Sequence, residues 1–546
     1  MTQEHIPVLI VGAGGAGLSL SLLLRQQGIL SMLVERRSDV SWYPRARNLN
    51  FRTLEIFRGL GLEAEVRAAG TRVSRVFRKQ SLASSEQEEL LDPSMLFEHL
   101  EAISPDQFIW YCPQSRLEPL LLAEARRRGG DVRYNTELVS FMQDDTGVTA
   151  TLQDRATGRS QVMHSDYLIA ADGAHSKIRE TLGVPTKGLG ELDEHYIFVY
   201  FRADWSQLIR GYESDGILIE NTNVRSMFLI TDKDRGMFLI MYSPSQGESA
   251  QNFTAERCKN MILSAMGKAD MAIEIVDMAH WQPAERVAER FQQGHVFLVG
   301  DAAHTMPPKM GLGVNTAIQS AQNLAWKLAA VLKGNASPQL LATYETERHP
   351  VAWLAAEQSL TGPAATFLTK GTDSALLPEE KRVSLFSLIV GYRYRSQAIV
   401  SEDTAPSTPG EVELLERPEL TGQPGTRVPH LWVERQGQRI STLDLLDGRF
   451  VLLTGAGGTA WGEAATAVAA RLGISLSTYR IGANADLLDL ENGWPAKMGV
   501  SGDGAMLIRP DGFVAWRSST RPPSPEPRLV QVLSRILCRS IPPTCL

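Results

Sequence analysis

A glycine-rich segment near the N-terminus places the strongest constraint on the fold. Residues 8–35 read VLIVGAGGAGLSLSLLLRQQGILSMLVE: an apolar strand, a turn with Gly12, Gly14 and Gly17, a helix, and a second strand ending at Glu35. In this spacing the glycines allow a tight turn, a close approach of a pyrophosphate to the backbone, and close packing of helix on strand. Unpaired N–H groups at the helix start attract an anion, and the acid can bind ribose hydroxyls. The segment therefore predicts a parallel sheet that binds an ADP-containing cofactor.

Composition narrows the class of protein further. A chain of 546 residues exceeds one compact core, so roughly two to four domains are expected. The net charge of −7 lacks long runs, which excludes a basic surface for nucleic acid or an anionic membrane and favours a small-molecule partner.

The cysteines and the N-terminus bear on location. Cys112, Cys258, Cys538 and Cys545 lack C-x-x-C or metal-site spacing, which indicates free thiols in a reducing compartment and no bound metal. The apolar run near the N-terminus follows Glu4 and contains glycines, so it resembles neither a signal peptide nor a membrane span. We therefore expect a cytoplasmic protein.

Two later motifs fit the same nucleotide site. Residues 172–179, DGAHSKIR, follow an apolar strand and suit a turn that reaches toward a pyrophosphate, although the pattern alone also fits an ordinary capped helix start. Further on, an apolar strand ends at Gly300 and Asp301, before a Pro- and Gly-containing loop and a long helix that begins near Asn315. Asp301 can accept ribityl hydroxyls of a flavin, and backbone N–H groups of the 306–314 loop can face an anionic ring carbonyl.

Residues 196–277 have a different texture. Several β-rich runs separated by turn residues predict an antiparallel sheet inserted between the cofactor motifs, where it can roof a substrate pocket. Most of its aromatic and Met side chains are expected in the core, and a subset facing the flavin can hold a flat apolar ligand. Arg45, Arg47 and Arg52 form either a solvated basic face or contacts to cofactor or substrate.

The three motifs, in this order across the first 360 residues or so, resemble the single-component FAD-dependent aromatic hydroxylases of the para-hydroxybenzoate hydroxylase class. The remainder, with GYRYRS at 391–396, PGTRVPHLWV and LIRPDGFVAWR, is similar to phenol hydroxylases and aromatic polyketide hydroxylases of the anthracycline type, which carry a C-terminal thioredoxin-like domain. Trp461-Gly462-Glu463 stands where a redox-active version would carry C-x-x-C, so packing or dimerisation is expected there rather than thiol chemistry.

The resemblance implies an α/β architecture: a Rossmann-like FAD-binding domain, an inserted antiparallel β-sheet substrate domain and a thioredoxin-like domain. The expected boundaries are 1–180 and 281–400 for the FAD-binding domain, 181–280 with part of 75–110 for the substrate domain, 401–430 for a linker, and 431–546 for the C-terminal domain.

Motifs and resemblance together give the expected site. The cofactor residues are Gly12, Gly14, Ala16, Gly17, Glu35, Arg36, Arg45, Gln114, Leu138, Asp172, Gly300, Asp301, Pro307, Gly311, Leu312, Gly313, Val314 and Asn315. The substrate residues are Phe201, Phe228, Met241 and Pro308. Three positions depart from the pattern of the family. Lys309-Met310 stands where small residues are common, Ser320 replaces a frequent Asp, and His295 replaces a common Arg. These departures bear on the mobility of the flavin and on local packing.

The chemistry that the resemblance implies uses FAD, O₂ and transiently bound NADPH, with NADH as an alternative, and it passes through a C4a-hydroperoxyflavin that hydroxylates a phenolic or polycyclic aromatic ring. Arg393 and Arg395 are the candidate catalytic residues, because an Arg beside the phenol oxygen stabilises the reactive phenolate. Tyr392 and Tyr394 are alternative partners, and a structural bridge between domains is the ordinary role of such arginines.

Two rival functions remain open at this point. One is Baeyer–Villiger insertion of oxygen into an aromatic polyketide, and the other is a flavin-bound protein without turnover. The oligomeric state is expected to be a monomer or a homodimer.

Overall fold

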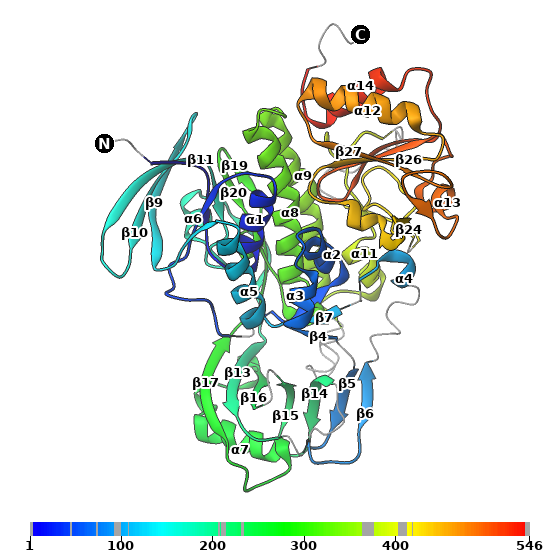
Figure 1. The fold of residues 1–546 in the computed structure, drawn as a ribbon. Coiled ribbons are helices and arrows are strands. Elements are labelled where there is room, and N and C mark those ends of the chain that lie inside the picture. The colour runs from blue at the N-terminus through cyan, green and yellow to red at the C-terminus, as the bar shows by residue number, and fades with distance from the viewer. Residues whose placement is uncertain are drawn as a thin grey trace.

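Three units surround a pair of long helices in this computed structural model (Figure 1). A nucleotide-binding domain is central, a β-sheet domain lies below it in that view, and a C-terminal domain lies at the upper right. The described residues are 4–43, 46–72, 75–91, 100–106, 109–205, 208, 214–230, 234–362, 376–401, 412–417 and 419–540. None of the described helices combines the length and apolar composition that a membrane span requires.

The nucleotide-binding domain is built on a mostly parallel sheet. Its strands are β1 (Glu4–Val11), β2 (Ser31–Val34), β8 (Asp131–Arg133), β9 (Thr136–Asp144), β10 (Gly147–Asp154), β11 (Ser160–Ala170), β19 (Gln292–Gln293) and β20 (Val296–Leu298). The order is β19-β20-β11-β1-β2-β8, and β9 and β10 extend antiparallel from β11. Val8, Leu9 and Ile10 in β1 are fully buried, as expected for a parallel strand covered on both faces.

Helices cover this sheet and define the long axis of the molecule. They are α1 (Gly15–Gln26), α2 (Phe51–Gly59), α3 (Glu63–Ala68), α5 (Gln114–Arg127), α6 (Lys177–Thr181), α8 (Gly313–Leu332) and α9 (Ala342–Gln358). Helix α1 packs against both α5 and α8, and α8 packs against α9. Ala321, Leu324 and Leu328 on the apolar stripe of α8 are fully buried. At 1.5 Å per residue α8 is about 30 Å long, so it reaches from the nucleotide site to the C-terminal domain.

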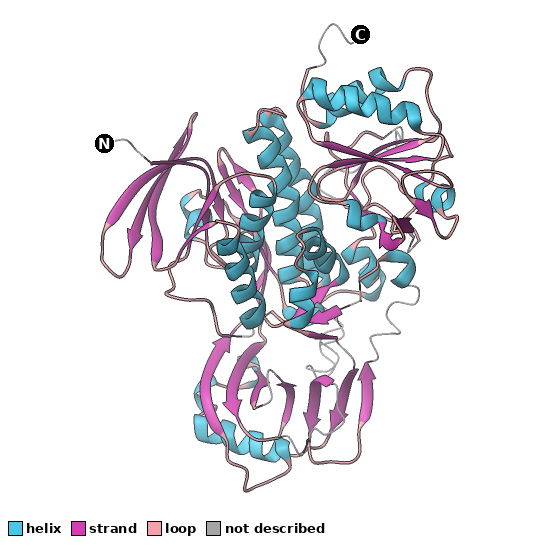
Figure 2. Ribbon diagram, viewed as in Figure 1, coloured by secondary structure: helices cyan, strands magenta, loops and turns pink. Residues whose placement is uncertain are grey.

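The sheet domain contains a seven-stranded sheet in the order β17-β13-β16-β15-β14-β5-β6. The strands are β5 (Arg75–Lys79), β6 (Glu88–Leu91), β13 (His195–Arg202), β14 (Ser214–Glu220), β15 (Arg225–Ile230), β16 (Arg235–Tyr242) and β17 (Glu274–Trp281). β5 pairs in parallel with β14, so a segment far upstream completes the sheet. Figure 2 shows helix α7 (Ala255–Met266) against one face of it.

Short sheets connect these two domains. One consists of β12 (Thr186–Glu191), β18 (Ala284–Ala288) and β21 (His304–Thr305), and the other of β3 (Asn48–Asn50), β4 (Thr71–Arg72) and β7 (Ile109–Tyr111). Short elements lead onward to the C-terminal domain: α4 (Leu100–Ile103), α11 (Leu385–Ile389), β22 (Tyr392–Arg393) and β23 (Glu413–Leu414).

The C-terminal domain has the thioredoxin-like order β27-β26-β29-β30, in which only the β26–β27 pair is parallel. Its elements are β24 (Trp432–Arg435), β25 (Gln438–Ser441), β26 (Phe450–Gly455), α12 (Thr459–Leu472), β27 (Leu476–Ile481), β28 (Leu488–Asp489), α13 (Trp494–Met498), β29 (Ala505–Ile508), β30 (Val514–Ser518) and α14 (Pro525–Ile536). Trp461, in the segment where a redox-active version was expected to carry C-x-x-C, is fully buried against Trp516 and donates its indole N–H to the Asp503 carbonyl at 3.0 Å.

Candidate active site

The turn between β1 and α1 requires two of its three motif glycines for steric reasons. A Cβ on Gly12, whose φ is +111°, would lie 2.1 Å from the Ala171 carbonyl oxygen, and one on Gly17 would lie 2.0 Å from the Gly12 carbonyl oxygen. Gly14 differs, because its nearest neighbour would be Glu118 Oε1 at 3.6 Å. Helix α1 starts beside Gly14 without a side-chain cap or an acid in its first turn. The turn is therefore a cradle that leaves room beside Gly14 at the start of a helix, which suits a pyrophosphate.

Glu35 closes the cradle at the end of β2. Its Oε2 accepts the Ala13 N–H at 2.9 Å, and its Oε1 accepts the backbone N–H and the Nε–H of Arg37, each at 3.0 Å. Burial raises the pKa of this carboxyl, but the hydrogen bonds from Arg37 and Ala13 outweigh it, so the pKa is lowered overall. An ionised, fixed carboxylate is the acceptor that ribose hydroxyls need. Arg37 orients Glu35, whereas the side chain of Arg36 is exposed.

Helix α5 contributes a carboxyl that the sequence reading missed. Gln114 donates to Glu118 Oε1 at 2.5 Å, and Glu118 is fully buried beside Gly14. Burial raises the pKa of Glu118. The spacing of four residues between Gln114 and Glu118, which places both on one face of the helix, could have indicated Glu118 from the sequence. Leu138 lies half-buried against the core of this domain, and Arg45 falls outside the described residues.

The second and third motifs meet each other. Arg179 donates to the Ala302 carbonyl at 3.0 Å and to the Ala174 carbonyl at 3.2 Å, which joins the turn after Asp172 to the turn at 300–302. Asp172 Oδ2 accepts the Ile178 N–H at 3.3 Å, and burial raises the pKa of this carboxyl. Asp301 has an exposed side chain.

Close contacts bring the third motif to the first. A Cβ on Gly300 would lie 3.1 Å from Ala16 Cβ, and one on Gly15 would lie 3.3 Å from Val314 Cγ2. The starts of α1 and α8 are therefore adjacent. The structure thus gathers most of the expected cofactor residues around one cradle.

The 306–314 loop leads into α8, which begins without a side-chain cap. Gly311 adopts a φ of +64°, Leu312 and Pro307 are buried, and Pro308 is exposed. Asn315 accepts from the Asn50 N–H and the Thr53 hydroxyl and donates to the carbonyls of Asn48 and Gly311. Its side chain therefore holds the loop in place against the segment 48–53.

A buried lysine ties the loop to the sheet domain. The Lys309 ammonium has no exposed surface and pairs with Glu194, just before β13, and it also donates to the Leu360 carbonyl at 3.3 Å. Glu194 accepts the Tyr196 hydroxyl at 2.8 Å. The departure from small residues at 309 thus creates a link from the loop to the face of the seven-stranded sheet that carries Tyr196.

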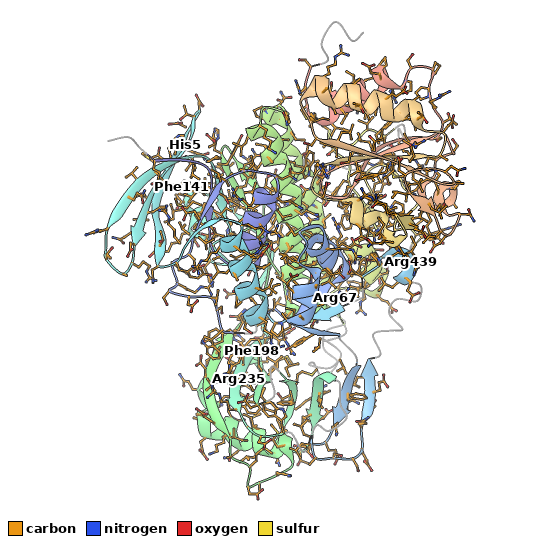
Figure 3. All side chains as sticks on the ribbon, viewed as in Figure 1. His5, Arg67, Phe141, Phe198, Arg235 and Arg439 are labelled. Carbon is orange, nitrogen blue, oxygen red and sulfur yellow. The ribbon has the colours of Figure 1, made fainter. Side chains whose placement is uncertain are left out.

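The sheet has two unlike faces, since successive side chains of a strand alternate. Tyr196, Phe198 and Tyr200 lie on one face, where Trp42 and Tyr43 of the nucleotide-binding domain contact Tyr200 with ring centroids 5.4 and 5.2 Å apart. Figure 3 shows Phe198 at the end of the sheet nearest that domain. Half-buried Met241 pairs with Tyr196 across β13 and β16 and lies on this same face.

Phe201 and Phe228 require a correction. Both are 1% exposed and pack with the α7 residues Cys258 and Ile262 on the opposite face. They form the core of the sheet domain, and the structure does not place them for contact with a substrate.

Arg393 and Arg395 also lie in a setting other than the expected one. Both pair with Glu413, and Arg393 donates to the Pro424 carbonyl at 2.7 Å and to the Ser401 hydroxyl at 3.0 Å. Tyr392 and Tyr394 instead accept from Arg348 of α9. These contacts favour the structural bridge over phenolate stabilisation, because the guanidinium groups are engaged along the chain that leads into the C-terminal domain.

Comparison with known proteins decides the family. Residues 5–359 match the family described as FAD binding domain, and residues 421–540 match the aromatic-ring hydroxylase C-terminal domain. The chain belongs to the FAD-dependent aromatic-ring hydroxylases.

Relatives match this hydroxylase over almost its whole length. The tetracenomycin B2 monooxygenase-dioxygenase of Streptomyces olivaceus is 39% identical over 99% of this chain and 100% of its own. The 4-methyl-5-nitrocatechol 5-monooxygenase of a Burkholderia species is 38% identical over 98% of each. A crystal structure of aklavinone-11 hydroxylase with FAD and aklavinone superimposes with a TM-score of 0.89, at 36% identity, over 99% of this chain and 100% of that one. The hydroxylase is an enzyme, which sets aside a flavin-bound protein without turnover.

Proposed function

We propose that the hydroxylase uses NAD(P)H and O₂ to add one oxygen atom to an electron-rich aromatic ring of a phenolic or polycyclic, polyketide-type compound. The observation that carries this proposal is the aromatic and apolar face of the sheet, with Tyr196, Phe198 and Met241, linked through Glu194 to the 306–314 loop. The compounds named for the relatives, tetracenomycin B2, aklavinone and a nitrocatechol, support it.

The residues fit FAD. Gly14 and the open start of α1 would hold the pyrophosphate, Glu35 the adenosine ribose, Asp301 the ribityl chain, and the 306–314 loop with the first turn of α8 the ring. When bound, FAD supplies electron transfer from the nicotinamide and the activation of O₂, chemistry for which amino-acid side chains offer no equivalent.

The task of the protein is then to hold the substrate ring and exclude water. Phe198 is half-buried, so part of its ring is available for edge or face contact with a flat ligand. Tyr196 is fully buried and directs its hydroxyl to Glu194, so it stiffens this face. Lys309 keeps the loop against the sheet through the same carboxylate.

The test is NADPH-linked oxygen uptake with product mass, across naphthacene and anthraquinone phenols and simple catechols. We expect substrate-dependent gain of one oxygen atom with the ring system intact. A lactone or an opened ring would instead establish Baeyer–Villiger insertion, and NADPH oxidation without any oxygenated product would overturn the proposal. A reducing, cytoplasmic setting is part of the proposal, supported by the free thiols of Cys112, Cys258 and Cys538.

A further inference from the structure

A cluster of buried charges joins the C-terminal domain to the helix pair α8 and α9. We call Asn323, Lys327, Glu347, Arg509 and Asp511 the junction cluster; each is at most 2% exposed. On the nucleotide-binding side, Lys327 donates to Glu347 Oε2 at 2.8 Å and to Asn323 Oδ1 at 2.7 Å, and Asn323 donates to Glu347 Oε2 at 2.6 Å. Carboxylate and ammonium are thereby removed from water together.

The C-terminal domain completes the cluster from the turn between β29 and β30. Arg509 donates to both oxygens of Glu347, at 2.5 and 2.9 Å, and to both oxygens of Asp511, at 3.0 and 2.5 Å. Asp511 Oδ2 also accepts from Asn323 Nδ2 and from the Trp326 indole, each at 3.2 Å. Such fork-shaped, two-oxygen contacts fix orientation as well as distance.

The next residue of α9 extends this arrangement to the nucleotide site. Arg348, fully buried, donates to Ser320 Oγ at 3.1 Å and to the Thr316 carbonyl at 3.3 Å, in the first turns of α8. It also donates to the Tyr394 hydroxyl at 2.8 Å, and the Tyr394 ring stacks on Phe513 of the same C-terminal turn at 4.2 Å. The turn 509–513 therefore bonds to Glu347 directly and contacts Arg348 through Tyr394.

We propose that Arg509 is a positioning residue for the flavin: the C-terminal domain, through Glu347 and Arg348, sets the place of the first turn of α8 and of the 306–314 loop that precedes it. Thr316 connects Arg348 to the loop: its carbonyl accepts from Arg348, and its N–H donates to the Leu312 carbonyl within the loop. The thioredoxin-like domain, which lacks redox cysteines, thus has a role in arranging a cofactor site on another domain.

The experiment uses the full-length protein with Arg509→Met and Arg509→Lys. For each, the affinity of the apoprotein for FAD, the visible circular dichroism of bound flavin and the thermal unfolding midpoint are measured. We expect Arg509→Met to weaken FAD binding on the order of tenfold and to change the flavin dichroism, since small displacements of a positioned group have large effects. Arg509→Lys keeps the charge but not the fork, so its affinity should be intermediate, and it carries the test where Arg509→Met does not fold.

Two controls separate positioning from general destabilisation. Leu487→Ala opens a cavity in the C-terminal core outside the junction cluster, and Arg480→Met removes an arginine that pairs with Asp486 on the surface of the same domain. Where Leu487→Ala lowers the thermal unfolding midpoint as much as Arg509→Met does, it should still leave the FAD affinity and the flavin dichroism unchanged. Arg480→Met should also leave both unchanged.

A double variant tests the route. Arg509→Met and Glu347→Met interrupt the same connection, so their effects on FAD affinity should not add, and the double variant should bind FAD about as weakly as Arg509→Met alone. FAD affinity within twofold of the parent protein in both Arg509 variants, or equal weakening by Leu487→Ala, would overturn the proposal. These readouts need no substrate, so they are independent of the oxygenation assay that tests the proposed function.

Discussion

The nucleotide-binding domain meets its two neighbours through contrasting surfaces. Toward the C-terminal domain it buries the junction cluster, in which every charge has several fixed partners. Toward the sheet domain the polar pairs Lys309 with Glu194 and Tyr43 with Asp277 are separate from each other, and aromatic contacts such as Tyr43 with Tyr200 lie beside them. Directional bonds hold one geometry, whereas ring contacts tolerate adjustment, so the second surface suits a site that admits ligands.

The largest change in stability is expected from a substitution in the junction cluster. Glu347→Ala leaves Lys327 and Arg509 buried without their shared carboxylate, and removal of one partner of such a pair costs about 3–5 kcal/mol of unfolding free energy. Denaturant unfolding measures it, with exposed Glu463→Ala as the control. A loss below about 1 kcal/mol would show that the cluster is not a fixed joint.

The two faces of the seven-stranded sheet offer the next comparison. Phe228→Ala creates a cavity beside α7 and should lower the free energy of unfolding by about 3 kcal/mol with little change in the Michaelis constant for the aromatic substrate. Phe198→Ala, on the other face, should do the reverse: a small loss of stability and a Michaelis constant raised several-fold. Unfolding curves and steady-state kinetics on the same preparations decide it, and identical behaviour of the two variants would contradict the assignment of faces.

Acid should lower the free energy of unfolding through His304, which lies near Arg348 of α9. Burial and then the nearby Arg348 charge lower the pKa of His304 to about 3, so the ring is neutral in the folded protein. Between pH 6.5 and 3 the unfolded chain binds a proton that the folded chain refuses, so stability falls as pH falls through this window and is unaffected above it. At pH 5 His304 should cost about 2 kcal/mol of unfolding free energy. This contribution to the difference in unfolding free energy between pH 7 and pH 5 should be absent in His304→Phe.

The smallest effect is expected at the sheet junction. Tyr43→Phe removes the hydroxyl that donates to Asp277 but keeps the ring on Tyr200, so the unfolding free energy should fall by about 1 kcal/mol or less. Thermal unfolding measures this, and FAD affinity should stay unchanged. A loss as large as that of Glu347→Ala would remove the distinction between the two junctions.

Local geometry explains what the sequence could predict. Gly12 and Gly17 are required by contacts within the β1–α1–β11 unit itself, and Glu35 follows at the end of the next strand, so the motif carries its own structural meaning. The fold of all three units followed from such motifs and from the resemblance. Arg37, which the motif did not single out, is the residue that bonds to Glu35.

Features that depend on distant partners were not predictable in the same way. The register of β13 with β16 places Phe201 and Met241 on opposite faces, and the position of α7 shows which face is core. The pairing of Arg393 and Arg395 with Glu413 depends on how the chain returns after residue 411. The junction cluster joins residues from 323 to 511, and no spacing in the sequence indicates it.

The composition of the seven-stranded sheet has a practical consequence for protein engineering. β5 and β6 come from residues 75–91, whereas the other strands come from residues 195–281. A chimera that exchanges this roof with that of a relative must therefore carry two separate inserts, matched along the parallel seam between β5 and β14. A single-crossover graft of the later segment alone would join a foreign β14 to the resident β5, and register errors at that seam are the failure to expect.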